Sequence, residues 1–169
     1  GGNIIDARIH TSRTGWAMDN FLVQDPHCAP FREAQQLERL KKSIADALAN
    51  RIDLLPKLAQ RPLPHSRSKA FDVSPRVLFD NKASNRFTVI EVNARDRPAL
   101  LNRLARVLFE QRLVVHSAQV TNYGERAADT FYVTDLTGDK LSEGERQNRL
   151  EARLVEAAGD AMQARLEEA

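Results

Sequence analysis

Two segments of this 169-residue chain occur twice, and this internal repeat constrains the fold more than any other feature. Asn3–Ile9 aligns with Val114–Val120, and Asp19–Asp25 aligns with Asp129–Asp135, with a slip of one residue between the two segments. Such a repeat predicts one supersecondary unit used twice. A strand-like run, Phe87–Asn93, precedes the second copy, and the first copy has no counterpart of it. The sequence therefore predicts a complete module and the C-terminal half of another, as expected of a fragment that begins without Met.

Composition excludes several classes of protein. The 25 basic and 23 acidic residues leave a net charge of +2, which gives no strong field for nucleic acid or an anionic membrane. One cysteine, Cys28, excludes an internal disulfide framework and fits a reducing compartment. No apolar run has the length of a membrane span, and the first residues do not form a signal peptide. We therefore expect a cytoplasmic protein without nucleic-acid or membrane partners.

The first module is predicted over residues 1–60. Alternating apolar residues predict strands over 3–10 and 17–25, joined at a turn around Gly15. From residue 31 to about 50 the period changes to that of a helix, with an apolar stripe made of Leu37, Leu40, Ile44 and Leu48. Residues 61–72 hold two prolines and several basic residues, a composition typical of a linker.

The second module is predicted over residues 73–169. Its expected strands are 76–79, 86–93, 113–122 and 127–135. Asp96 is predicted to cap the first helix, with Pro98 in its first turn, and Ser142 is predicted to cap a final helix that Gly159 interrupts.

This order of elements predicts an α+β, ferredoxin-like fold of the split βαβ kind, with one strand missing at its C-terminal end. The segment after Gly159 is rich in helix formers, so we expect the strand at 76–79 to take the missing place. The last strand would then be permuted to the front. A right-handed crossover and two hairpins predict the sheet order 76–79, 86–93, 127–135, 113–122.

Two motifs resemble the ACT domain, a βαββαβ module that senses small molecules. Asp96–Leu101 resembles the family's loop between its first strand and first helix, where Asp or Asn precedes x-Pro and a small residue. Asn3–Ile9 matches the pattern Asn-Ile-x-x-Ala-x-Ile of the second strand, and Val114–Val120 matches it loosely. More narrowly, the phrase from Asn3 to Phe21 is similar to the C-terminal region of the family of bifunctional uridylyltransferase/uridylyl-removing enzymes, which act on the PII nitrogen-regulatory protein.

This resemblance implies a regulatory region that binds glutamine and controls distant catalytic domains in nitrogen signalling. It implies PII protein as a partner through the parent enzyme, a nucleotidyltransferase and phosphodiesterase that uses Mg²⁺ and UTP; no cofactor is expected in this segment. Ligand contacts are expected from one loop and one strand, namely Asp96, Arg97, Pro98, Ala99, Leu100, Leu101 and Asn3. Val114 stands where the family often has Asn, so the two modules are not expected to bind ligand equally.

The residues themselves support ligand binding by this loop. A helix N-terminus offers free N–H groups and partial positive charge to an amino-acid carboxylate, while Asp96 can pair with the ammonium group. Ala99 leaves the backbone accessible. A second hypothesis is a ligand-free dimerisation or protein-interaction module.

We expect no catalytic or metal site in this chain. Its four histidines, His10, His27, His65 and His116, share no ligand spacing, and no histidine lies at helical spacing from Cys28. No paired carboxylates or phosphate-binding loop are visible. An RNA-binding sheet requires exposed aromatic residues, whereas Phe87 and Phe131 are predicted to face the helices and leave Tyr132 as the candidate.

Small and aromatic residues at repeated positions are predicted to form the core: Ala7, Ala118, Phe21 and Phe131. Without a preceding strand and helix, the first hairpin would expose apolar side chains, including Ile5, Ile9 and Val23. We therefore expect it to dimerise, or to pack against another ACT unit such as the second module.

Overall fold

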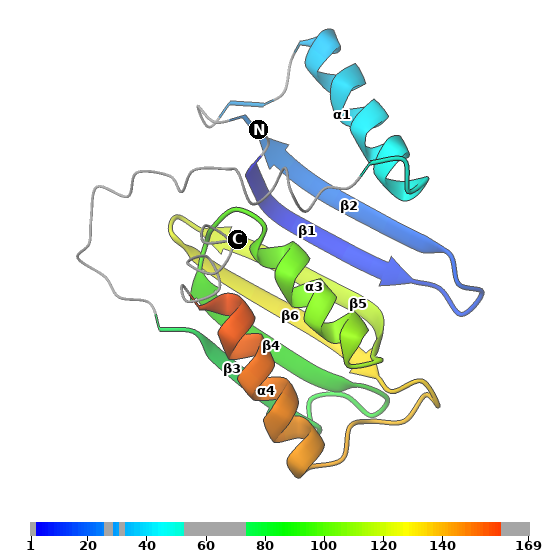
Figure 1. Cartoon of the computed structure of the whole chain (residues 1–169), viewed down its shortest axis with the longest axis vertical. Helices are drawn as coiled ribbons and strands as arrows, with labels where there is room; N and C mark the ends of the chain where they lie inside the picture. Colours follow the sequence, from blue (N-terminus) through cyan, green and yellow to red (C-terminus); the bar gives the residue numbers. More distant parts are fainter. Residues whose placement is uncertain (1–2, 26–28, 31–32, 53–73, 160–169) are drawn as a thin grey trace.

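A computed structural model describes residues 3–25, 29–30, 33–52 and 74–159. In chain order the named elements are β1 (Asn3–Thr11), β2 (Ala17–Gln24), α1 (Ala34–Leu48), β3 (Arg76–Asp80), β4 (Thr88–Arg95), α3 (Leu100–Glu110), β5 (Val114–Tyr123), β6 (Arg126–Thr134) and α4 (Glu145–Ala158). All six strands belong to one antiparallel sheet with the order β2-β1-β5-β6-β4-β3. Figure 1 shows α3 and α4 lying across one face of this sheet, over the second module.

The second module has the predicted strand order, β3-β4-β6-β5. β3 pairs antiparallel with β4 at the sheet edge, so the strand at the front of the module occupies the edge that the missing last strand would fill. The α+β, ferredoxin-like fold and its permuted strand are therefore confirmed. Alternation along the strands explains the layering, because Ile90, Val92 and Ala94 of β4 face the helices and are at most 1% exposed. Leu104 and Leu108 of α3 and Leu150 and Leu154 of α4 complete this core.

The two repeat copies join along one seam, where β1 pairs antiparallel with β5 over Asp6–His10. At the centre of the seam Arg8 faces Gln119, and these two residues occupy equivalent positions in the repeat (Asn3 and Val114 are 111 residues apart, as are Arg8 and Gln119). The pairing is therefore isologous, with each copy using the same strand edge. The prediction that the first hairpin packs against the second module is confirmed along this edge.

Among the described residues, no helix covers the first copy. Ala7, Ala118 and Phe131 are buried as predicted, but Phe21, the equivalent of Phe131, is 48% exposed, so its prediction as a core residue is wrong for this chain. The reason is that α1 makes no contact with another named element of the described chain, and Figure 1 shows it standing beyond β2. Leu37, Leu40, Ile44 and Leu48 of α1 are all exposed.

Both predicted helix caps in the second module are wrong. α3 begins at Leu100, and its N-cap is Ala99, which adopts a left-handed conformation with φ of 64°. Asp96 lies three residues earlier, where its main-chain N–H donates to the carbonyl of Glu125 at 2.8 Å. α4 begins at Glu145, and its N-cap is Gly144, two residues beyond Ser142. Gly144 has a φ of 128°, a conformation that favours glycine. It ends at Ala158, just before Gly159, as the sequence predicted.

The predicted linker 61–72, His27, His65 and Cys28 lie outside the described residues. Within the described ranges, no helix combines the length and apolar character needed to cross a membrane.

Arg97 fastens the loop before α3 to the end of α4. Its side chain is 7% exposed, and its guanidinium donates to the main-chain carbonyl oxygens of Ala158 and, at 2.8 Å, Gly159. A cation at this place meets the negative end of the α4 dipole and the carbonyl groups that a helix end leaves without intrahelical partners. Arg97 is thus a structural residue, and its head group is directed at α4.

We expect Arg97→Met to lower the free energy of unfolding by about 2 kcal/mol or more, because buried carbonyl groups lose charge-assisted hydrogen bonds. Arg95→Met is the matched control, since Arg95 makes a partly exposed ion pair with Glu125 at 3.4 Å and should cost less than about 1 kcal/mol. Urea unfolding followed by circular dichroism measures both values. Equal losses in the two variants would contradict the structural role of Arg97.

Candidate functional site

The loop between β4 and α3 lies at the end of the sheet where the two copies meet. Asp96 is tied to the β5–β6 turn through Glu125, and the amide of Asn122 donates to the carbonyl of Ile4 at 2.7 Å. The register of β1 and β5, continued toward the start of β1, brings Asn3 level with Gly124. The loop and the start of β1 therefore occupy the same corner of the molecule.

The predicted site residues divide into two groups. Asp96, Pro98 and Ala99 are partly exposed at the loop, and Asn3 is exposed at the start of β1, where it pairs with Gln24. No hydrogen bond joins Asn3 to the loop within the described ranges. Leu100 is buried, Leu101 packs against the core, and Arg97 holds the end of α4. These last three residues support the loop from beneath.

Asp129 is the residue of this corner that the sequence prediction missed. It lies on β6 between Ala127 and Phe131, on the face that the helices cover, and it is 2% exposed. Its Oδ1 atom has no hydrogen-bond partner among the described residues. The signal was present in the sequence, because alternation places residue 129 on the same face as Phe131 and Val133.

Asp96 and Asp129 form a pair of carboxyl groups that are costly to ionise. Burial and, to a smaller extent, the negative charge of Asp96 together raise the pKa of Asp129 to about 7. Burial also raises the pKa of the Asp96 carboxyl, although a hydrogen bond from the main-chain N–H of Arg97 opposes that shift. A positively charged group placed between them would relieve both effects. This corner therefore has the electrostatic character of a site for a primary ammonium group.

The first turn of α3 supplies the complementary charge. Helix geometry leaves its first N–H groups without intrahelical partners, and the dipole is positive at this end. Ala99, whose side chain is small, stands at the entrance to this turn. A zwitterion with its carboxylate toward α3 and its ammonium toward Asp96 would meet favourable charge at both ends.

A metal centre has no support in the described part of the chain. No group of three or more His, Cys, Asp or Glu side chains there lies close enough to hold an ion.

The chain aligns with curated proteins over 94% to 100% of its length. It is 66% identical over 169 residues to a bifunctional uridylyltransferase/uridylyl-removing enzyme of Erythrobacter litoralis, and 69% identical over 160 residues to the enzyme of that name from Novosphingobium aromaticivorans. A relative of the same name from Zymomonas mobilis is 51% identical over 159 residues. The chain spans 18%, 18% and 17% of these relatives' lengths. The resemblance predicted from the sequence is confirmed, and it is to a region of these longer proteins.

No protein-family model matches the chain. No solved structure matches it either.

The pH dependence of stability tests the buried carboxyl group. The pKa of Asp129 is about 7 in the folded chain against an ordinary 3.8, so the folded state holds this proton more tightly than the unfolded state. The contribution of the protonated Asp129 carboxyl to the stability of the folded state is complete below the unfolded pKa. It is lost as the pH rises through the folded pKa. We expect Asp129→Asn to match the original near pH 4 and to exceed its stability at pH 8, by up to ~4 kcal/mol.

Urea unfolding at several pH values measures this difference. Asp19→Asn is the matched control, because Asp19 occupies the equivalent place in the first copy but is exposed. It should change stability by less than about 0.5 kcal/mol at either pH. If the difference in free energy of unfolding between Asp129→Asn and the original does not vary with pH, ionisation of Asp129 does not destabilise the folded state.

Proposed function

We propose that this chain is a regulatory, glutamine-sensing region of a PII-protein uridylyltransferase/uridylyl-removing enzyme that controls nitrogen signalling in the cytoplasm. The alignment of this chain with a region that makes up 18% of proteins of that name supports the parent enzyme. One structural observation carries the ligand proposal: the partly exposed carboxyl of Asp96 and the buried carboxyl of Asp129 lie close enough to repel each other near the start of α3. An amino acid would bring its ammonium group to these carboxyl groups and its carboxylate to the first turn of α3.

The mode of binding follows from this arrangement. The ligand's ammonium group would contact Asp96, whose carboxyl is partly exposed, and its charge would also lower the cost of ionising the deeper Asp129. The ligand's carboxylate would take the N–H groups of the first turn of α3. The amide of a glutamine side chain needs polar partners, and Asn3 at the start of β1 is the nearest candidate supplied by the other copy.

The isologous seam explains why the two copies would not bind alike. Antiparallel pairing brings the start of β1 toward the loop of the second module, and the start of β5 toward the β1–β2 turn of the first copy. Asn3 begins β1, whereas the apolar Val114 begins β5. The site at the second module's loop therefore has a polar residue from the other copy, whereas the residue at the corresponding place in β5 is apolar. We propose one glutamine site of full strength.

Signalling would work by linkage between ligand and seam. A ligand that contacts the β4–α3 loop and β1 together favours the arrangement in which the copies are joined. That preference would bias catalytic domains elsewhere in the parent, where Mg²⁺, UTP and PII protein would act. This segment would carry out no chemistry itself.

Glutamine should bind this chain with a dissociation constant in the millimolar range or below, as measured by calorimetry. Asp96→Asn should weaken binding by at least about tenfold, because a charge-assisted contact worth about 1.4 kcal/mol or more is lost. The fold should survive, since the main chain of Asp96 makes the structural hydrogen bond to Glu125.

Asp19→Asn controls for the loss of one negative charge elsewhere on the sheet and should bind glutamine as the original does. If Asp96→Asn binds glutamine as tightly as the original, or if the original does not bind it at millimolar concentration, the assignment of the loop is wrong.

A second candidate function, a dimerisation or protein-interaction module, is favoured by a different observation. The apolar stripe of α1 is uncovered, with Ile44 52% and Leu48 81% exposed. Among the described residues, β2 pairs with one strand, β1, and a single bridge from Gln24 to Pro30 lies on its other edge. In the second module the equivalent strand, β6, has a partner on both edges, and the equivalent helix, α4, lies on the sheet. The uncovered face of the first copy is therefore suited to bind a strand followed by an amphipathic helix, as β6 and α4 are covered by β4 and α3 in the second module.

If this second candidate function holds, the chain should self-associate. Ile44→Lys should then shift it toward monomer in sedimentation velocity experiments, because a charge in the stripe is costly to bury. Gln35→Lys is the matched control, since it adds the same charge on the opposite side of α1. An original that stays monomeric at high concentration, or equal shifts in both variants, would count against association through this stripe.

A further inference from the structure

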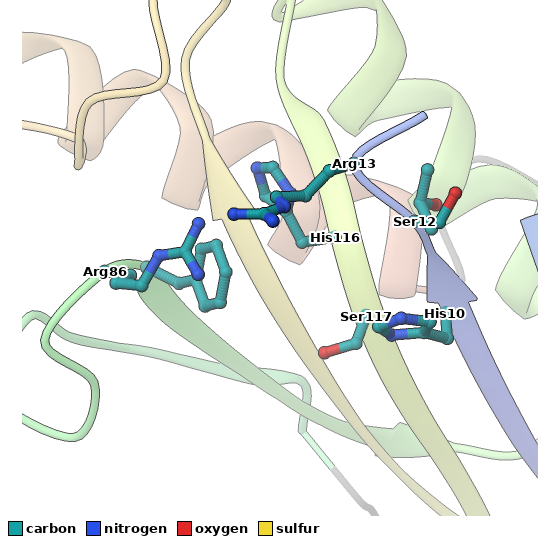
Figure 2. A pocket seen from close by; sticks show the side chains of 8 residues that line it. His10, Ser12, Arg13, Arg86, His116 and Ser117 are labelled. Atoms are coloured by element: carbon teal, nitrogen blue, oxygen red, sulfur yellow. The ribbon is translucent and has the colours of Figure 1, made fainter. Parts of the chain in front are cut away.

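An open pocket lies at the opposite end of the seam from the Asp96 loop. It has a volume of about 130 Å³ and is lined by both copies: Thr11 and Arg13 come from the β1–β2 turn region, and Arg86, Phe87 and His116 come from the second module. Figure 2 shows the guanidinium groups of Arg13 and Arg86 directed toward one another, with the His116 ring nearby. The pocket therefore joins residues that the sequence separates by more than seventy positions.

The floor of the pocket is aromatic and is on the sheet face opposite α3 and α4. Phe87 stacks on His116 with ring centroids 4.6 Å apart and meets the edge of Tyr132 at 6.5 Å. Since Phe131 is buried beneath the helices, alternation turns Tyr132 to the open face. The prediction that Phe87 faces the helices is therefore wrong. Its ring supports Arg86, whose guanidinium carbon lies 5.3 Å from the ring centroid.

Hydrogen bonds hold the His116 ring in place. The hydroxyl of Thr134 donates to the carbonyl of Asp135 at 2.9 Å, so it accepts from Nε2 of His116, also at 2.9 Å. Burial, followed by the positive charge of Arg86, lowers the pKa of His116. The His116 ring thus lines the pocket in a fixed orientation, and its lowered pKa favours the neutral form beside the guanidinium groups of Arg13 and Arg86.

The charge of the pocket is uncompensated. No carboxylate lines it, and neither Arg13 nor Arg86 makes an ion pair within the described part of the chain. Two guanidinium groups that converge without a counterion repel each other, and an anion between them turns this repulsion into attraction at both ends. Each guanidinium presents a planar fork of donors that matches a phosphate group.

We propose that this pocket binds the phosphate group of a small molecule, held between Arg13 and Arg86 over the Phe87–His116 floor. A phosphate dianion offers enough oxygen atoms for both forks and for the hydroxyl groups of Thr11 and Ser117 at the rim. The aromatic floor can stack with a planar substituent, so an aromatic phosphate ester and free phosphate share this chemistry. Binding would tie the β1–β2 turn to the β3–β4 loop. The site does not depend on glutamine binding at the other end of β5.

Calorimetry on this chain at constant ionic strength tests the proposal with three probes: inorganic phosphate, glycerol phosphate and phenyl phosphate. We expect saturable binding, with Arg13→Gln and Arg86→Gln each weakening it at least about tenfold. Arg126→Gln is the matched control, because Arg126 is exposed at the other end of the sheet. Tighter binding of phenyl phosphate than of glycerol phosphate supports an aromatic ester as the ligand, and equal binding of all three supports free phosphate.

The imidazole signals of His116 in proton NMR spectra locate the site. They should shift on titration with phosphate in the original and in Arg126→Gln, and not in the Arg13→Gln, Arg86→Gln double variant. Circular dichroism confirms that each variant is folded. Absence of saturable binding up to about 10 mM, or an equal loss of binding in Arg126→Gln, would overturn the proposal.

Discussion

The main-chain pairing of β1 with β5 is the interaction on which the rest of this structure depends. It makes one continuous sheet from two repeat copies, and its register sets which residues meet at each end. At one end the start of β1 reaches the β4–α3 loop, and at the other the β1–β2 turn reaches Arg86. Both proposed binding sites are products of this pairing, because each takes residues from both copies.

Equivalent residues in the two repeat copies differ in burial. Asp19 and Asp129 hold the same position in the repeat, yet one is exposed and the other is 2% exposed beneath helices. The raised pKa of Asp129 is therefore a property of the covering helices and not of the repeated sequence.

Prediction from sequence succeeded where local patterns determine structure. Alternation and turn residues gave the hairpins, and the absence of a last strand indicated that Arg76–Asp80 fills the sheet edge. Prediction failed at the start of α3, because the left-handed conformation of Ala99 is not encoded by a recognised cap. Asp129 was overlooked although its face was predictable. The meeting of Arg13 with Arg86 was beyond prediction, because it depends on the register between copies.

The clamp from Arg97 to the end of α4 has a consequence for genetic studies of this region. Substitutions at Arg97 or Leu100 would disturb the β4–α3 loop through its support. Under the proposed function, they would be recovered beside Asp96 in a screen for lost regulation. The two classes would differ in cellular abundance, because a loss of stability of one or two kcal/mol lowers the level of a protein several-fold. Protein levels measured alongside the phenotype would thus separate residues that touch an effector from residues that keep the loop in position.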